Sequence, residues 1–231
     1  MRYMRFAYRT RLLGLTLIVI STLAGSSQCQ FEGPSNNPLI KALSAADLAE
    51  ARRIVNSGAR LNVRDNYGST PLIVAINCHY TDFAEILLSA GADATFAGSG
   101  GDTPLMGAAW EGDLKIAKKL LDRGASVNTM NSHGETALKF ASQTGLDGKM
   151  VQLLLDAGAD PNAMGKDRLT ALMAAARNPV AAKKLLEAGA DPTIRSKYGD
   201  TVEDDSCDRG AKDFFEVCTL VRGALMKRQT R

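Results

Sequence analysis

The feature that most constrains the fold of this 231-residue chain is a repeat of about 33 residues. A Gly-Ala pair ends five runs rich in Leu, Ile and Val, with glycines at Gly58, Gly91, Gly124, Gly158 and Gly189. A threonine stands twelve residues after each glycine, at Thr70, Thr103, Thr136, Thr170 and Thr201, and Asn37 holds the equivalent position before the first pair. Such a period is typical of arrays in which similar units stack on one another.

The residues of each unit predict two short helices. Thr or Asn at the first position can cap a helix by accepting a hydrogen bond from its N–H groups, and proline suits the first helical position that follows. Small residues would let this first helix approach its neighbours, namely Ala75, Ala108, Ala109, Ala141, Ala175 and Ala176. Leucine pairs would fill the buried stripe of the second helix, namely Leu87 with Leu88, Leu120 with Leu121, Leu154 with Leu155, and Leu185 with Leu186.

Glycine marks where the chain turns. The Gly of each Gly-Ala pair is expected to end the second helix in the left-handed conformation, which a residue without Cβ adopts at low cost. A further glycine two residues before most threonines makes the connecting turn, although Arg168 replaces it in the fifth unit. His79 stands where later units have glycine, so we expect a turn residue there.

The pattern resembles the ankyrin repeat, whose core phrase is TPLH-x-A. The phrases here are NPLIKAL, TPLIVAI, TPLMGAA, TALKFAS, TALMAAA and TVEDDSC. The resemblance implies an all-α ankyrin-repeat solenoid of about six helix-turn-helix units with β-hairpin-like loops, over residues 37–224, with units starting near 37, 70, 103, 136, 170 and 201. The family's His is replaced at every unit, by Ile73, Met106, Lys139, Met173 and Asp204 in the later five. Acids in the sixth phrase indicate a terminal unit that closes the array.

The first 27 residues are typical of a secretory signal peptide. Four arginines precede an apolar run from Leu12 to Ala24, and small residues follow. Thirteen residues are too few for a spanning helix, which needs about 20. We therefore expect a signal peptide at 1–27, an N-terminal segment at 28–36, a basic tail at 225–231, and a periplasmic or secreted protein. A lipoprotein anchored at Cys29 is the alternative, with Gln28 where a small residue would be expected.

Charge and motifs argue against several function classes. The whole chain has 28 basic and 25 acidic residues, but the signal peptide removes four arginines and no acid, so the remainder lacks the basic excess of a nucleic-acid-binding protein. The glycine-rich GSGGDTP lacks the lysine of a phosphate-binding loop, and no HExxH or CxxC occurs. We expect no catalytic residue, no cofactor and no metal site, and an enzyme is the less favoured alternative.

The four cysteines suggest disulfides if the protein is exported. Cys207 and Cys218 fall on the two helices expected in the last unit, both facing the seam between them, and we predict that they are bonded. The alternative is two buried thiols that act as small hydrophobic groups. Cys29 with Cys78 is a weaker candidate pair.

In ankyrin-repeat proteins the partner usually lies along the concave face, which the loop tips and the exposed side of the first helices form. Carried over position by position, this implies partner contacts at Tyr67, Ser69, Asn77, Trp110, Glu111, His133, Glu135, Gln143, Lys166, Arg177 and Tyr198. Trp110 is the strongest candidate because tryptophan is enriched at interface hot spots, although it could pack against a neighbouring unit instead.

The resemblance therefore implies a scaffold that binds another protein, of unidentified kind, and we expect the scaffold itself to be monomeric. The resemblance implies two roles for this scaffold, protection against stress and the neutralisation of a toxin. A secreted effector that binds a host protein is the alternative.

Overall fold

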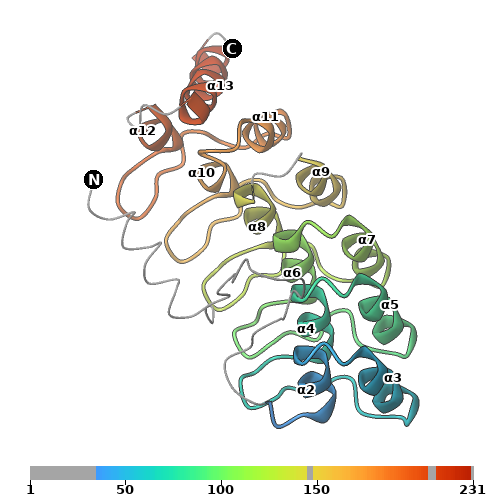
Figure 1. Cartoon of the computed structure of the whole chain (residues 1–231). Helices are drawn as coiled ribbons and strands as arrows, with labels where there is room; N and C mark the ends of the chain where they lie inside the picture. Colours follow the sequence, from blue (N-terminus) through green and yellow to red (C-terminus); the bar gives the residue numbers. More distant parts are fainter. Residues whose placement is uncertain (1–34, 145–147, 208–211, 230–231) are drawn as a thin grey trace. The chain divides into compact units, whose positions relative to one another are not determined.

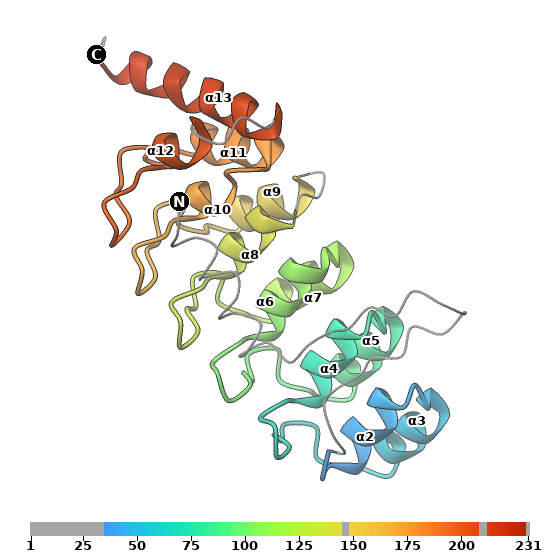
Figure 2. The same cartoon turned by 60° about the vertical axis from the view of Figure 1, so that its left-hand side comes forward.

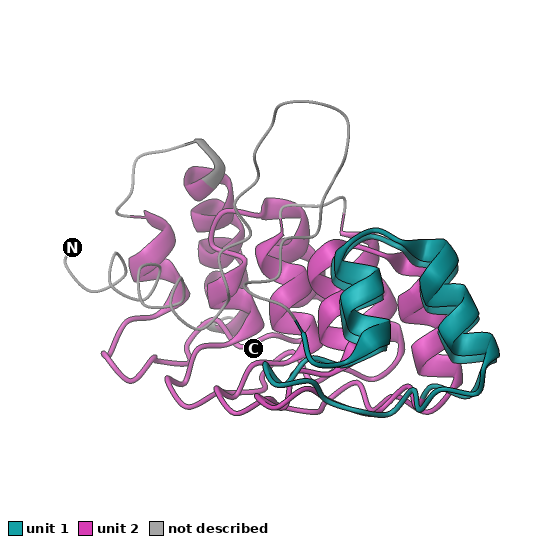
Figure 3. Cartoon of the chain, turned by 60° about the horizontal axis from the view of Figure 1, so that its bottom comes forward, with its two compact units in different colours: residues 1–92 teal, residues 93–231 magenta. Residues whose placement is uncertain are grey.

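A computed structural model describes residues 35–144, 148–207 and 212–229 (Figure 1). The chain divides into two compact units, residues 1–92 and 93–231 (Figure 3). The described residues form helices and loops and contain no strand. The predicted signal peptide at 1–27 and most of the segment at 28–36 lie outside the described residues.

The first unit contains two helix pairs, α2 (Pro38–Ser44) with α3 (Leu48–Asn56) and α4 (Pro71–Asn77) with α5 (Thr81–Ser89). Each pair packs within itself, and α2 also packs against α4.

The second unit contains four pairs: α6 (Pro104–Glu111) with α7 (Leu114–Asp122), α8 (Ala137–Gln143) with α9 (Lys149–Asp156), α10 (Ala171–Ala174) with α11 (Pro179–Glu187), and α12 (Val202–Cys207) with α13 (Lys212–Gln229). The first helices α6, α8, α10 and α12 contact one another in order, and so do the second helices α7, α9, α11 and α13 (Figure 2). The unit is therefore a stack of two helical layers, and the predicted all-α architecture of repeated helix-turn-helix units is confirmed.

The predicted caps begin the first helix of the first five pairs. The side chain of Asn37 accepts a hydrogen bond from the N–H of Ile40 at 3.1 Å. The four threonine caps do the same three residues on, at 3.2 to 3.3 Å, namely Thr70, Thr103, Thr136 and Thr170. Each cap satisfies an N–H group that the helix leaves without a partner.

The glycine positions also behave as predicted. The five Gly-Ala glycines have φ between 80° and 96°. Where other residues stand at such positions, they adopt the same left-handed conformation: φ is 57° at His79 and 55° at Arg168. The guanidinium Nε of Arg168 donates to the carbonyl of Arg195 at 3.1 Å, a contact that glycine could not make.

The core departs from the sequence prediction at the leucine pairs. The six small residues predicted for the first helices are buried, although Ala175 and Ala176 lie just after the short α10, and Leu87 and Leu88 are buried as well. In the later pairs only the first leucine is fully buried, namely Leu120, Leu154 and Leu185, while the second is half-buried. Neighbouring helical residues point about 100° apart, so in these three pairs the second leucine lies at the edge of the seam.

The last described helix pair is joined covalently. A disulfide between Cys207 and Cys218 joins α12 to α13, with the two Cα atoms 5.1 Å apart, so this predicted pairing is confirmed. The carboxylate of Asp204 accepts hydrogen bonds from the N–H and hydroxyl groups of Thr201, both at 2.8 Å, and these bonds lower the pKa of Asp204. Cys29 lies outside the described residues, and the suggested Cys29–Cys78 pairing stays a prediction.

Helix α13 is longer than the repeat requires. Phe214, Val217, Cys218 and Val221 form its buried stripe, whereas Leu225 further along is only half-buried. The helix continues to Gln229, into the segment predicted as a basic tail from residue 225. No described helix is long and apolar enough to cross a membrane.

Candidate partner-binding surface

Tight turns connect the helix pairs and carry many of the predicted contact residues. Four turns are closed by a hydrogen bond from the N–H of the first residue to the carbonyl of the last, at 2.8 to 3.1 Å, over residues 65–69 in the first unit and 98–102, 131–135 and 196–200 in the second. Asp65, Asn131 and Ser196 each accept two more N–H groups inside their own turn. These side chains are at most 9% exposed, so they hold the backbone of the turn from within.

Neighbouring turns of the second unit are also bonded to each other. The N–H of Ser132 donates to the carbonyl of Gly100 at 2.8 Å, and the amide of Asn131 donates to Asp102 at 2.6 Å. Further along, the N–H of Lys197 donates to the carbonyl of Asp167 at 3.0 Å, and their side chains form an ion pair. The hydrogen bond to Asp167 raises the pKa of Lys197. Side chains at these tips therefore project from an ordered backbone.

Trp110 is half-exposed, which fits neither extreme of the prediction. Its exposed fraction is 43%. Its ring, on α6, meets the ring of Phe140, on α8, edge to face at 5.9 Å between centroids. The tryptophan thus packs against the next helix pair and still presents a large apolar surface, which is the arrangement of an anchored contact residue.

Arg177 and Tyr198 are likewise exposed and held in place. The guanidinium of Arg177 lies over the ring of Phe214 at 5.6 Å. The ammonium of Lys197 lies over the ring of Tyr198 at 5.1 Å, and Tyr198 is 57% exposed. Contacts of this kind order a long side chain before a partner arrives.

The remaining predicted residues differ in exposure. In the first unit Tyr67 is exposed, whereas Ser69 and Asn77 are half-buried. In the second unit His133 and Lys166 are exposed, whereas Glu111 and Gln143 are half-buried. We define the second-unit surface as Trp110, His133, Lys166, Arg177 and Tyr198.

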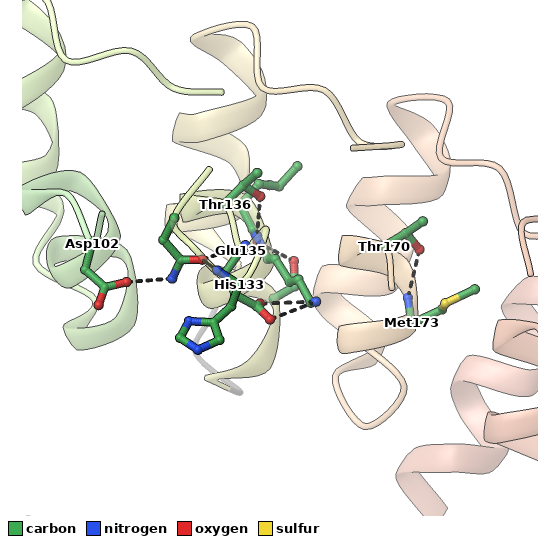
Figure 4. A network of polar contacts seen from close by, with 10 residues as sticks. Asp102, His133, Glu135, Thr136, Thr170 and Met173 are labelled. Atoms are coloured by element: carbon green, nitrogen blue, oxygen red, sulfur yellow. Dashed lines mark hydrogen bonds and ion pairs between the residues drawn. The ribbon is translucent and has the colours of Figure 1, made fainter. Parts of the chain in front are cut away.

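Glu135 differs from the other predicted contact residues, because its side chain is buried and the prediction assumed that it is exposed. It is 6% exposed, and its carboxylate is within 3.1 to 3.2 Å of the ammonium of Lys139, which is 5% exposed (Figure 4). The side chain turns inward because a buried ammonium needs an opposite charge beside it. His133, two residues earlier, is exposed and points away from Thr136 in the same view.

Lys139 was not among the predicted site residues. The sequence does contain a signal for Lys139. It occupies the position where other repeats carry Ile73, Met106 or Met173, and an acid, Glu135, lies four residues before it. Glu135 stands just before the cap Thr136 and Lys139 lies in the first turn of α8, so the two side chains meet at the start of that helix. In this repeat, Lys139 stands where the family has its His, and it makes a different polar contact, with Glu135.

Among residues 35–144, 148–207 and 212–229, no three His, Cys, Asp or Glu side chains gather in the geometry of a metal site. The two histidines lie in different units, His79 at the turn before α5 and His133 at the turn before α8.

The comparison with known proteins agrees with the geometry. A family model described as ankyrin repeats (3 copies) matches residues 13–98, 47–131 and 105–196. No curated protein matches the chain.

Proposed function

The chain belongs to the ankyrin-repeat family, whose members are protein–protein interaction scaffolds, and we propose that it is an exported, periplasmic scaffold that captures one partner protein on its second-unit surface. Ankyrin-repeat proteins are generally not enzymes, and we propose no catalysis here. The observation that carries the proposal is Trp110, an anchored and 43% exposed tryptophan on a first helix.

The ordered turns explain how such a surface would bind. Association costs free energy for each side chain that must be immobilised, on the order of 1 kcal/mol for a flexible one. Bonds within and between turns, and the contacts of Arg177 and Tyr198 with neighbouring groups, order these side chains in advance. More of the contact energy is then available for affinity.

Two features support export. The first 27 residues have the charge and apolar pattern of a signal peptide. The Cys207–Cys218 disulfide suits an oxidising compartment, where such bonds persist. Within the periplasm the partner would be a toxin that the scaffold neutralises, or a protein that it protects during stress. Lipoprotein anchoring at Cys29 is the lesser alternative.

The first test concerns the partner surface. The tagged protein is used to isolate its partner from the native organism, and the affinity of the purified pair is then measured by calorimetry. Trp110→Ala is expected to weaken binding by more than about 1 kcal/mol while unfolding stays cooperative, because an exposed aromatic anchor is lost.

Lys118→Ala provides the control, since Lys118 is exposed on the second helix α7. It should leave the affinity unchanged. Unchanged binding by Trp110→Ala together with a lower melting temperature would assign the tryptophan to packing and sink the proposed surface.

The second test concerns location. Cells that produce the tagged protein are separated into cytoplasm, periplasm and medium, and the processed chain should appear in the periplasm. Recovery from the medium would favour a secreted effector that binds a host protein. Recovery of an unprocessed chain from the cytoplasm would contradict export.

A further inference from the structure

Helix α13 carries an exposed apolar face that the second-unit surface does not use. Phe215 is 71% exposed and Met226 is 66% exposed, the largest values among the big hydrophobic side chains that the structure describes. The two residues are eleven positions apart, and eleven helical steps of about 100° bring them to within about 20° of one another around the axis, about 16 Å apart along it. They lie on one stripe of the helix surface, with Thr219 and Arg222, which is paired with Glu203, between them.

The stripe borders a groove. A cavity of about 760 Å³ lies between α11 and α13, with Val180, Phe215 and Leu220 among its apolar lining residues. Lys183 and Glu216 line it as well. In Figure 2, α13 lies beyond α11 and α12, with its far side facing no other described helix of its unit.

Gly223 lies between the two ends of the stripe and has no packing reason in the described residues. A Cβ added there would meet nothing within 4 Å. Glycine inside a helix weakens it relative to alanine, so an exposed glycine on a long helix carries a cost without a contact in the monomer. A small residue at this place lets a second helix approach closely.

The charges along the same face run from acidic to basic. Glu216 stands near the start of α13 and forms no ion pair with a described residue, while Lys227 is exposed near its end. Two copies of α13 placed antiparallel would bring each acid near the other copy's base, and each helix N-terminus near the other's C-terminus. Both arrangements are electrostatically favourable.

We propose that α13 is the interface of a homodimer in which two copies of this helix pack antiparallel about a two-fold axis. Phe215 of each copy lies against Met226 of the other, at the groove beside Val180, and the axis passes between Thr219 and Gly223. The surface is complementary to itself. It has an apolar side chain at each end, a glycine near the centre and one charge of each sign, and these features meet in reverse order on the second copy. A second copy would therefore cover the whole face, in contrast to the monomer expected from the sequence.

The association is measured by sedimentation equilibrium of the purified protein over a range of concentrations. A helix pair with its adjoining grooves is a small interface, so we expect the mass to rise from one copy to two in the micromolar range. Phe215→Glu should raise the dissociation constant at least tenfold. Met164→Glu is the matched control, because Met164 is an exposed methionine outside α13, and it should leave the dissociation constant unchanged.

Two further variants separate the interface from a general loss of fold. Glu216→Lys should weaken the dimer, and Glu216→Lys with Lys227→Glu should restore it, because the exchanged charges again face each other. Gly223→Leu should weaken the dimer without lowering the melting temperature, because leucine favours the helix but prevents close approach.

A mass of one copy at every accessible concentration overturns the proposal. So does a dimer that persists unchanged in both Phe215→Glu and Gly223→Leu, since its interface would then lie elsewhere.

Discussion

At the scale of single residues, Gly134 and Gly165 bring two successive turns of the second unit into backbone contact. A Cβ on Gly134 would lie 2.5 Å from the Cα of Gly165, and a Cβ on Gly165 would lie 2.5 Å from the carbonyl oxygen of Gly134. Real Cβ atoms do not approach backbone so closely. The spacing of these turns therefore depends on the absence of both side chains.

We predict that Gly134→Ala lowers the free energy of unfolding by about 3 kcal/mol, because the new methyl group meets backbone and also forces a left-handed alanine. Gly199→Ala is the matched control, since Gly199 has φ of 89° but no atom within 4 Å of its Cβ position. It should cost only about 1 kcal/mol. Urea denaturation of both variants checks the difference, and equal losses would show that the turn contact is unimportant.

At the scale of one element, the start of α8 contains a buried ion pair where its counterpart in the next unit is apolar. Glu135 and Lys139 occupy the positions that Leu169 and Met173 hold around α10. A buried ion pair adds little to the free energy of unfolding, but removing one partner leaves a costly buried charge. The effect of replacing Glu135 therefore depends on whether Lys139 is present, and the reverse also holds.

We predict that Lys139→Met destabilises the protein by about 3 kcal/mol, because it leaves the Glu135 carboxylate buried without its counter-charge. The double variant Glu135→Leu with Lys139→Met copies the residues of the next unit and should recover most of that loss. Thermal and urea unfolding of the two variants provide the comparison. A double variant no more stable than the single one would contradict the interpretation.

At the scale of the whole molecule, a covalent bond joins the two helices of the last described pair. Helix α13 packs on α11 and α12, and α12 packs on α10, so the terminal pair has neighbours on one side only. In stacks of this kind stability is close to a sum of unit and neighbour contributions, and the end unit has the fewest. The Cys207–Cys218 disulfide adds a covalent link between the two helices of this pair.

Replacing both cysteines, with Cys207→Ala and Cys218→Ala, should lower the stability of the terminal pair by about 3 kcal/mol, because the short closed loop regains its freedom when the chain unfolds. Hydrogen exchange followed by mass spectrometry should show faster exchange in α12 and α13, with α6 to α9 unchanged. Alanine already stands at the positions equivalent to Cys207, namely Ala109 and Ala176, so it suits that position of the repeat. Unchanged exchange in α12 and α13 would mean that packing alone holds the pair.

The sequence predicted well every feature that depends on residues close together in the chain. The caps at Asn37 and Thr170 depend on an N–H group three residues on, and the helix-ending glycines depend on the backbone preference of one residue. The Cys207–Cys218 pairing followed from two short helices in one unit. Because the same local pattern repeats along the chain, the fold class could be predicted from the sequence.

Features that depend on where the next unit lies could not be read in this way. Glu135 was predicted to be an exposed turn residue, but it is buried beside Lys139. In the three later leucine pairs the second leucine is only half-buried. Trp110 needed the ring of Phe140, on another helix pair, to become an anchored residue with one free side.

The repeat phrase thus specified helix starts, helix ends and the order of units, because each rests on contacts within a few residues. Burial and the close approach of Gly134 to Gly165 arose from packing between segments some thirty residues apart or more, and that packing also left one face of α13 exposed. Such distances are a property of the folded chain, since the same local sequence can lie inside a stack or at its end.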